Sequence, residues 1–189
     1  MRKKKKGWTL KEIAAEQVDF KRKMMFLGWL TDEMNREGVD FTVVGGEAAE
    51  IYTFGKYESA DIDIVTSGSI ALREKLEEIG FQNKGKDWWS DDLRIFLEIP
   101  SSVIAGDEAR VKVIDLGDEM FVKVIGIEDM ILDRLAACEF WRYKIDCEIA
   151  LDLLARYREE LDMGYLEAKA KTDKVFSKLQ ELLESRDIQ

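Results

Sequence analysis

Residues 41–65 read FTVVGGEAAEIYTFGKYESADIDIV, and this stretch decides the fold. It opens with an apolar run rich in β-branched residues, which is typical of a strand. Gly45 and Gly46 follow directly, and a short helical pattern comes next. The stretch closes with Asp-Ile-Asp-Ile-Val, whose alternation has the period of a second strand. The sequence therefore predicts two strands connected by a glycine turn and a helix.

Each part of this stretch has a chemical use. Because Gly45 and Gly46 lack a Cβ, the backbone can approach a phosphate there, and the N–H groups of the following helix attract it. Asp61 and Asp63 project from one face of their strand, because side chains alternate along a strand. Their carboxylates can share divalent cations such as Mg²⁺ or Mn²⁺, which prefer oxygen ligands. The pattern indicates a site where divalent cations and a phosphate group can meet.

The stretch resembles the signature of the nucleotidyltransferase superfamily, which shares the polymerase-beta catalytic fold. That signature is a strand, Gly-Gly or Gly-Ser, a spacer, and then Asp-h-Asp-h, where h is apolar. The resemblance implies that Gly45 and Gly46 contact the triphosphate, while Asp61 and Asp63 bind metal.

The spacer departs from the family pattern just before the first aspartate. Many relatives carry Arg-x-Thr-x there, whereas this chain has Tyr-Glu-Ser-Ala at residues 57–60. Ser59 keeps a hydroxyl, and the resemblance makes it a nucleotide-binding candidate. The arginine is absent, so its phosphate or base contact is either lost or supplied by Lys56.

A third carboxylate usually completes the site in this superfamily, where it binds metal and helps to deprotonate the attacking hydroxyl. Glu98, in the apolar run IFLEIP, fits that role best. An acid inside such a strand is costly unless it is exposed, paired or bound to metal. Asp115, in VKVIDLG, is the alternative.

Residues 125–154 resemble the helical part of the abortive-infection and toxin–antitoxin branch of the superfamily. The matching features are a Glu-Asp pair at residues 128–129, Arg134 before Leu-Ala-Ala, and Lys144 near Asp146. In that branch the basic residue aids triphosphate binding, which implies this role for Arg134 and also for Lys144. The adjacent Lys-Asp of relatives is interrupted here by Ile145.

The sequence predicts an α+β fold, in which a small mixed sheet flanked by helices is followed by a C-terminal helical bundle. We expect a nucleotidyltransferase core with a long N-terminal helix over residues 1–126, and a helical region packed on it over residues 127–189. The expected helices are 9–37, 47–54, 69–79, 127–139, 143–160 and 163–185. The expected strands are 41–44, 61–65, 93–99, 111–116 and 120–125, and residues 81–89 are either a strand or a loop.

Composition excludes several classes of chemistry. The chain has no histidine, so Ser-His-Asp catalysis and histidine–zinc sites are excluded. The net charge of −10 argues against a general nucleic-acid coat protein. No apolar stretch is long enough to predict a membrane span. Cys138 and Cys147 are expected to be thiols in a reducing compartment, which makes the cytoplasm the default location.

These observations predict a Mg²⁺-dependent nucleotidyltransferase. It would transfer a nucleoside monophosphate from a nucleoside triphosphate to an acceptor hydroxyl by two-metal catalysis. The acceptor could be RNA, such as a tRNA end, a protein side chain, or a small molecule, and the acidic composition favours the last two. The rival is a non-catalytic nucleotide-binding or partner-binding protein of a toxin–antitoxin pair, with an antitoxin as its partner.

Overall fold

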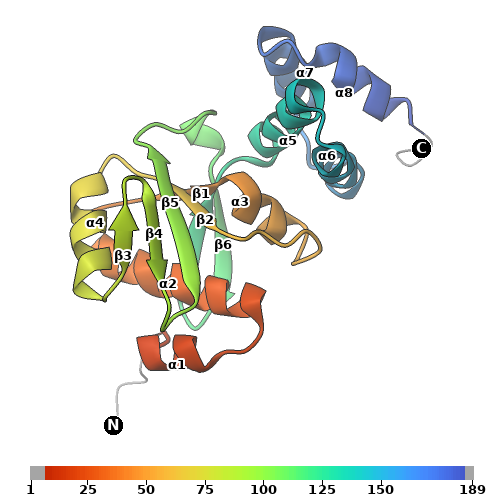
Figure 1. Cartoon of the computed structure of the whole chain (residues 1–189). Coiled ribbons are helices and arrows are strands. Elements are labelled where there is room, and N and C mark those ends of the chain that lie inside the picture. The colour runs from red at the N-terminus through yellow and green to blue at the C-terminus, as the bar shows by residue number, and fades with distance from the viewer. Residues whose placement is uncertain (1–6, 186–189) are drawn as a thin grey trace.

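The computed structural model describes residues 7–185 and places a mixed β-sheet at the centre of the molecule (Figure 1). Within these residues seven strands lie in the order β3-β4-β5-β2-β1-β7-β6. The strands are β1 (Thr42–Val44), β2 (Ile62–Val65), β3 (Gln82–Lys84), β4 (Asp87–Ser90), β5 (Ile95–Ser101), β6 (Lys112–Gly117) and β7 (Met120–Val124). The predicted α+β class with a mixed sheet is confirmed.

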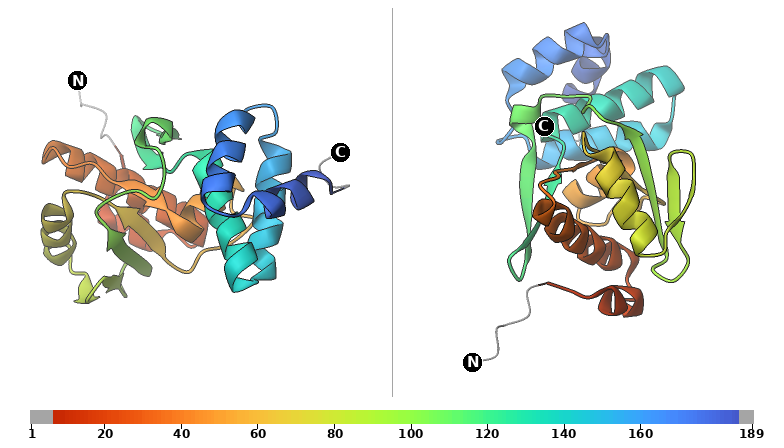
Figure 2. Two further views of the ribbon diagram at one scale, coloured as in Figure 1. Left: turned by 90° about the horizontal axis from the view of Figure 1, so that it is seen from above. Right: turned by 90° about the vertical axis from the view of Figure 1, so that its left-hand side faces the viewer.

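Helices cover the sheet on one face and at one end. The helices are α1 (Leu10–Ala15), α2 (Asp19–Arg36), α3 (Gly45–Tyr52), α4 (Ser69–Glu78), α5 (Ile127–Ala136), α6 (Lys144–Arg156), α7 (Met163–Thr172) and α8 (Phe176–Leu183). Helices α2 and α4 lie behind β3–β5 in Figure 1, and no described helix lies in front of these strands. Helices α5–α8 stand together at one end of the sheet (Figure 2). None of the described helices is long and apolar enough to cross a lipid bilayer.

The core forms where the apolar face of the sheet meets α2. Phe26 and Leu30 of α2 are buried, as are Ile62 and Ile64 of β2, and all four belong to one cluster of packed side chains. Ile62 and Ile64 alternate with Asp63, so burying the isoleucines turns the acid to the opposite face. The uncovered face of the sheet therefore receives the polar residues of β2.

The expected helix over 9–37 is two helices. Thr9 and Glu12 form the predicted capping box at the start of α1. The chain then leaves helical geometry at Glu16, whose carboxylate accepts the backbone N–H groups of residues 17 and 18 at 2.9 and 3.0 Å. The Arg94 guanidinium donates to the carbonyl oxygens of Ala14 and Glu16 at 3.1 and 2.6 Å. These bonds satisfy the backbone groups at the break.

Other boundaries also differ from expectation. The helix expected over 163–185 divides into α7 and α8 at Lys174, which has a left-handed φ of 62°. The expected helix over 127–139 ends its α-helical part at Ala136 and continues as a wider turn over Ala137–Trp141. Strand β5 runs through Pro100 to Ser101, beyond the last residue at which β4 pairs with it. The Ile99 N–H donates to the Lys86 carbonyl on the β4 side, so position 100 faces β2, and the proline is tolerated because the register between β2 and β5 shifts there.

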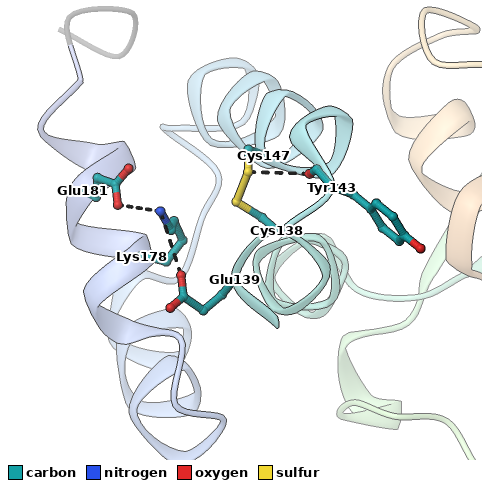
Figure 3. The surroundings of a disulfide bond; sticks show 6 residues. All are labelled: Cys138, Glu139, Tyr143, Cys147, Lys178 and Glu181. Atoms are coloured by element: carbon teal, nitrogen blue, oxygen red, sulfur yellow. Dashed lines mark hydrogen bonds and ion pairs between the residues drawn. A yellow bond between two sulfur atoms is a disulfide. The ribbon is translucent and has the colours of Figure 1, made fainter. Parts of the chain in front are cut away.

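A disulfide joins Cys138 to Cys147, so the expectation of free thiols is wrong (Figure 3). The wider turn after α5 and the first turn of α6 bring the two Cα atoms to 4.9 Å. Lys178 of α8 lies between Glu139 and Glu181, which packs α8 beside this turn (Figure 3). Free thiols were the reason to infer a reducing compartment, and the disulfide removes that reason. A cytoplasmic location stays a prediction.

We expect the disulfide to stabilise the C-terminal helices against unfolding. Closing a loop of this length contributes about 2–3 kcal/mol to the free energy of unfolding. Urea denaturation with and without a phosphine reductant measures this contribution. The double variant Cys138→Ser/Cys147→Ser should resemble the reduced wild type and should not respond to reductant. A wild type whose unfolding midpoint ignores the reductant would contradict the assignment.

A buried ion cluster connects α2 to α3. The Lys23 side chain is 4% exposed, and those of Glu47 and Glu50 are 0% and 1% exposed. The Lys23 ammonium lies 2.7 Å from Glu47 Oε2, contacts Glu50 still more closely, and donates to the Ser59 carbonyl at 2.9 Å. Burial raises the pKa of Glu47 to about 8; the Lys23 ammonium opposes this rise, and the neighbouring charge of Glu50 adds to it. The cluster fixes α3 and the loop before β2 relative to α2.

Replacing Lys23 with methionine should destabilise the fold by about 3–5 kcal/mol, because two carboxylates would stay buried without a cation. Urea denaturation followed by circular dichroism measures the effect. Lys21→Met is the matched control, since Lys21 is 64% exposed and its ion pair with Glu16 lies at the surface. If the free energies of unfolding of the two variants differ by less than about 1 kcal/mol, the buried cluster does not stabilise the fold as proposed.

Candidate active site

Three carboxylates meet on the uncovered face of the sheet. Strands β2 and β5 run parallel, with Asp63 directly opposite Glu98. One oxygen each of Asp61, Asp63 and Glu98 lies within 4.8 Å of the others. Asp115, the alternative third acid, lies exposed on β6 at the far edge of the sheet, where it accepts the Gly117 N–H. The structure thus brings Glu98, and not Asp115, to the two aspartates.

The glycine turn lies against this acid cluster. Gly45 has a left-handed φ of +63°, and a Cβ on it would stand 2.1 Å from Asp63 Oδ2. The backbone N–H of Gly46 donates to the Asp63 carboxylate. A side chain at Gly45 would therefore displace the acid, which explains why this residue must be a glycine. Helix α3 begins at Gly45 and not at residue 47 as expected, so both glycines belong to its first turn.

Asp63 ionises less readily than an ordinary aspartate. Burial is the main cause, and the neighbouring charges of Asp61 and Glu98 add to it, so that the pKa of Asp63 rises to about 6. The Gly46 N–H and the more distant Arg134 charge oppose this rise. Three carboxylates held this close repel one another, and a cation among them would relieve the repulsion.

Ser59 holds the loop that leads into β2. Its hydroxyl donates to the Asp61 carbonyl at 2.9 Å, and its backbone N–H donates to Glu50 at 2.8 Å. A Cβ on Gly46 would stand 2.5 Å from the Ser59 hydroxyl oxygen. Ser59 therefore lies beside the glycine turn, where its bonds fix the start of the Asp-Ile-Asp strand.

Arg134 and Gly46 line one pocket, of about 520 Å³, between the sheet and the C-terminal helices. The Arg134 guanidinium donates to Asp146 at 2.8 Å and also binds Asp133, so two carboxylates orient it. A guanidinium has five N–H groups, and these bonds leave some of them available to a ligand. Lys144 is exposed at the start of α6 and is not among the residues that line this pocket.

The Glu-Asp pair that opens α5 has a structural role. Glu128 accepts the backbone N–H of Asp162 at 2.9 Å. Asp129 accepts the Tyr165 hydroxyl at 2.7 Å and the backbone N–H of Asp107 at 3.0 Å. These bonds tie α5 to α7 and to the loop before β6, and so they position Arg134 one turn further along α5.

The sequence matches no protein-family model and no curated protein. Among solved structures, an antigenic nucleotidyltransferase-like protein from Paracoccidioides brasiliensis is similar, with a TM-score of 0.58 and 10% identity over 88% of this chain and 92% of that chain. ANT(2″)-Ia in complex with adenylyl-2″-tobramycin is also similar, with a TM-score of 0.51 and 11% identity over 78% of this chain and 98% of that chain. The fold is that of the nucleotidyltransferases.

Within this fold the site contains a residue that the sequence did not indicate. Lys86, in the turn between β3 and β4, places its ammonium on the Glu98 carboxylate. The register explains the contact, since β4 pairs with β5 so that Asp87 lies opposite Glu98. A lysine in an exposed turn carries no signal of its own, and the sequence of residues 81–89 is compatible with either a strand or a loop. Lys86 neutralises part of the acid cluster in the metal-free protein.

Asp63→Asn should stabilise the metal-free protein, and the gain should depend on pH. The folded-state pKa of Asp63 is about 6, above its ordinary value of 3.8. Below about pH 4 the Asp63 carboxyl is protonated in both the folded and the unfolded state, so it does not destabilise the fold. As the pH rises towards 6, the carboxyl ionises in the unfolded chain first, and the wild type loses folding free energy. This loss is complete above about pH 6. Because the carboxyl is partly exposed, we discount the effect to about 1–2 kcal/mol.

Thermal melts in chelator across this pH range measure the difference between Asp63→Asn and wild type. Asp115→Asn is the matched control, since Asp115 is exposed and away from the cluster. The melting-temperature difference should be a few degrees at pH 7.5 and should disappear near pH 4. An Asp63→Asn protein that is less stable than wild type at pH 7.5 would show that the acids do not repel one another.

Proposed function

We propose that this protein transfers a nucleoside monophosphate from a nucleoside triphosphate to an acceptor hydroxyl. The observation that carries the proposal is the acid cluster of Asp61, Asp63 and Glu98 directly against the Gly45–Gly46 turn. The nucleotidyltransferase fold of the two similar structures supports it. The toxin–antitoxin resemblance, with its antitoxin partner, stays a prediction.

The acid cluster fits Mg²⁺ or Mn²⁺. All of its ligand atoms are carboxylate oxygens, which hard cations prefer, and they lie close enough to be shared. Asp61, Asp63 and Glu98 would hold the metal. When bound, the ions neutralise the triphosphate and polarise the reacting phosphate.

The pocket lined by Gly46 and Arg134 is the candidate triphosphate site. The free N–H groups at the start of α3 favour an anion there. Arg134, oriented by Asp146, would donate its remaining N–H groups to the phosphates. Lys56 and Tyr57 line the same pocket, so Lys56 supplies the basic side chain that the absent arginine of relatives would have given. Lys144 stays a weaker candidate, because it lies outside this lining.

The reaction we propose is an in-line displacement at the α-phosphorus. The acceptor oxygen forms a bond to this phosphorus while the bond to the bridging oxygen of pyrophosphate breaks, and pyrophosphate leaves. The Glu98 carboxylate accepts the proton of the acceptor hydroxyl. Asp63 keeps its position because β2 lies inside the sheet, paired on both sides, and Asp61 directly precedes this strand.

A small-molecule acceptor is the best supported of the three acceptor classes. One structure of the same fold holds adenylyl-2″-tobramycin, a nucleotide joined to a small molecule. The net charge of −10 also disfavours RNA, whose phosphates would be repelled by an acidic protein. Transfer to a protein side chain or to a tRNA end is distinguished from transfer to a small molecule by the label-transfer assay described below.

Mg²⁺ together with the correct nucleoside triphosphate should raise the melting temperature of the wild type by several degrees. A ligand at about 100 times its Kd adds about 2.7 kcal/mol to the stability of the folded state. Asp63→Asn should lose this gain, because its neutral amide is a poor metal ligand. Asp115→Asn should keep it. The measurement is a thermal melt with each triphosphate, with and without Mg²⁺.

Label transfer completes the test. Each labelled triphosphate is incubated with separate RNA, protein and metabolite fractions of a cell extract, and label is expected in the metabolite fraction. Asp63→Asn should abolish the transfer. Identical responses of wild type and Asp63→Asn in both assays would favour the non-catalytic rival.

A further inference from the structure

A second pocket lies beside the acid cluster on the side of β4 and β5, whereas the triphosphate pocket lies at α3, which follows β1 on the other flank of β2. It has a volume of about 340 Å³, and Asp61 and Glu98 of the cluster form part of its wall. The rest of the wall is mainly apolar and comes from β4 and β5, with Trp89 and Phe96 prominent in it. Two substrates that react at one acid cluster need two adjoining pockets, and this pocket adjoins Glu98.

The strand register makes Trp89 and Phe96 a platform beside Glu98. Trp89 lies directly opposite Phe96 across β4 and β5, and Asp87 lies opposite Glu98. Phe96 and Glu98 are alternate residues of β5, so they share one face and stand about 7 Å apart. Phe96 is 57% exposed although it is a large apolar residue, and no described helix covers this face of β3–β5 (Figure 1). An exposed Phe96 beside a half-buried Trp89 is suited to hold a ring.

We infer that the platform of Trp89 and Phe96 binds the acceptor, and that the acceptor is a small alcohol with an apolar or aromatic ring. This inference rests on the proposed function. A ring stacked on Phe96 would place a hydroxyl on a short arm, about 7 Å away, at the Glu98 carboxylate. The acceptor hydroxyl then approaches the acid cluster from the side of β4 and β5, away from the pocket of Gly46 and Arg134, as an in-line displacement requires.

The pocket favours a small molecule over the end of an RNA chain. Its volume suits a compact ligand. Among the described residues that line it, the charged ones are Asp61, Asp87 and Glu98, and none is basic. A phosphate backbone would face these carboxylates directly, and Lys84 and Lys86 on the neighbouring hairpin lie outside the lining. The aromatic surface therefore has to supply the affinity, and a ring without phosphate is the ligand that it fits.

The test uses 2-phenylethanol, which carries a ring and a hydroxyl on a two-carbon arm, with acyclic 1-hexanol and a short single-stranded RNA as comparisons. Nuclear magnetic resonance titration of the full chain gives each Kd, and the Trp89 indole signal reports the site. Phe96→Ala should weaken 2-phenylethanol binding about tenfold. Phe140→Ala is the matched control, because Phe140 is also 57% exposed and lies on the C-terminal helical part. It should leave the Kd unchanged.

Stabilisation by Mg²⁺ and triphosphate is measured in parallel, and it should be equal in wild type, Phe96→Ala and Phe140→Ala. A wild type that is stabilised by triphosphate but binds no ring alcohol better than 1-hexanol would overturn the inference and leave the proposed function standing. Loss of triphosphate stabilisation in Phe96→Ala would show that the platform holds the nucleobase, which also overturns it. Tighter binding of the RNA at Trp89 would assign the pocket to a nucleic acid instead. A wild type without any response to triphosphate would remove the proposed function itself.

Discussion

The close approach of Gly45 to Asp63 is the constraint on which the rest of the site depends. Since a Cβ at Gly45 would stand 2.1 Å from the Asp63 carboxylate, the turn after β1 and the acid of β2 occupy a shared space that admits no side chain. The antiparallel pairing of β1 with β2, in which Val44 lies opposite Asp63, creates this proximity. A phosphate held by the turn would therefore lie beside the carboxylate oxygens that we propose as metal ligands.

The molecule surrounds this point with fixed charges. Lys23 neutralises part of a buried carboxylate pair beneath α3, and the same ammonium binds the Ser59 carbonyl in the loop before β2. On the other side of the turn, Asp146 orients Arg134. Near the site, Lys23 and Arg134 are each held by two or more acceptors. Such preorganisation lowers the cost of ordering when a ligand binds.

Local patterns predicted the placement of the three acids better than they predicted the structure around them. The alternation of Asp-Ile-Asp-Ile and the apolar run around Glu98 indicate strands with acids on one face, and the structure has both. The convergence of those strands is a matter of register, which the resemblance supplied and the periodicity could not. Lys86 reaches Glu98 only because of a hairpin whose two short strands have no clear alternation. The Cys138–Cys147 disulfide depends on a wide turn after α5, and a nine-residue separation does not encode that turn.

The parallel pairing of β1 with β7 has a consequence for the order in which the chain becomes organised. Val43 lies beside Val124, the Ile125 N–H donates to the Val43 carbonyl at 2.9 Å, and the Tyr52 hydroxyl donates to the Ile125 carbonyl at 2.6 Å. During synthesis the acids of β2 and β5 can meet once residue 101 has left the ribosome, whereas β1 gains its second neighbour only after residue 125. Contacts between distant parts of a chain form slowly because a long loop must close first. The three acids can therefore come together before the rest of the site. The strand that carries the glycine turn is paired on both sides only after β7, which leads into the C-terminal helices, has been synthesised.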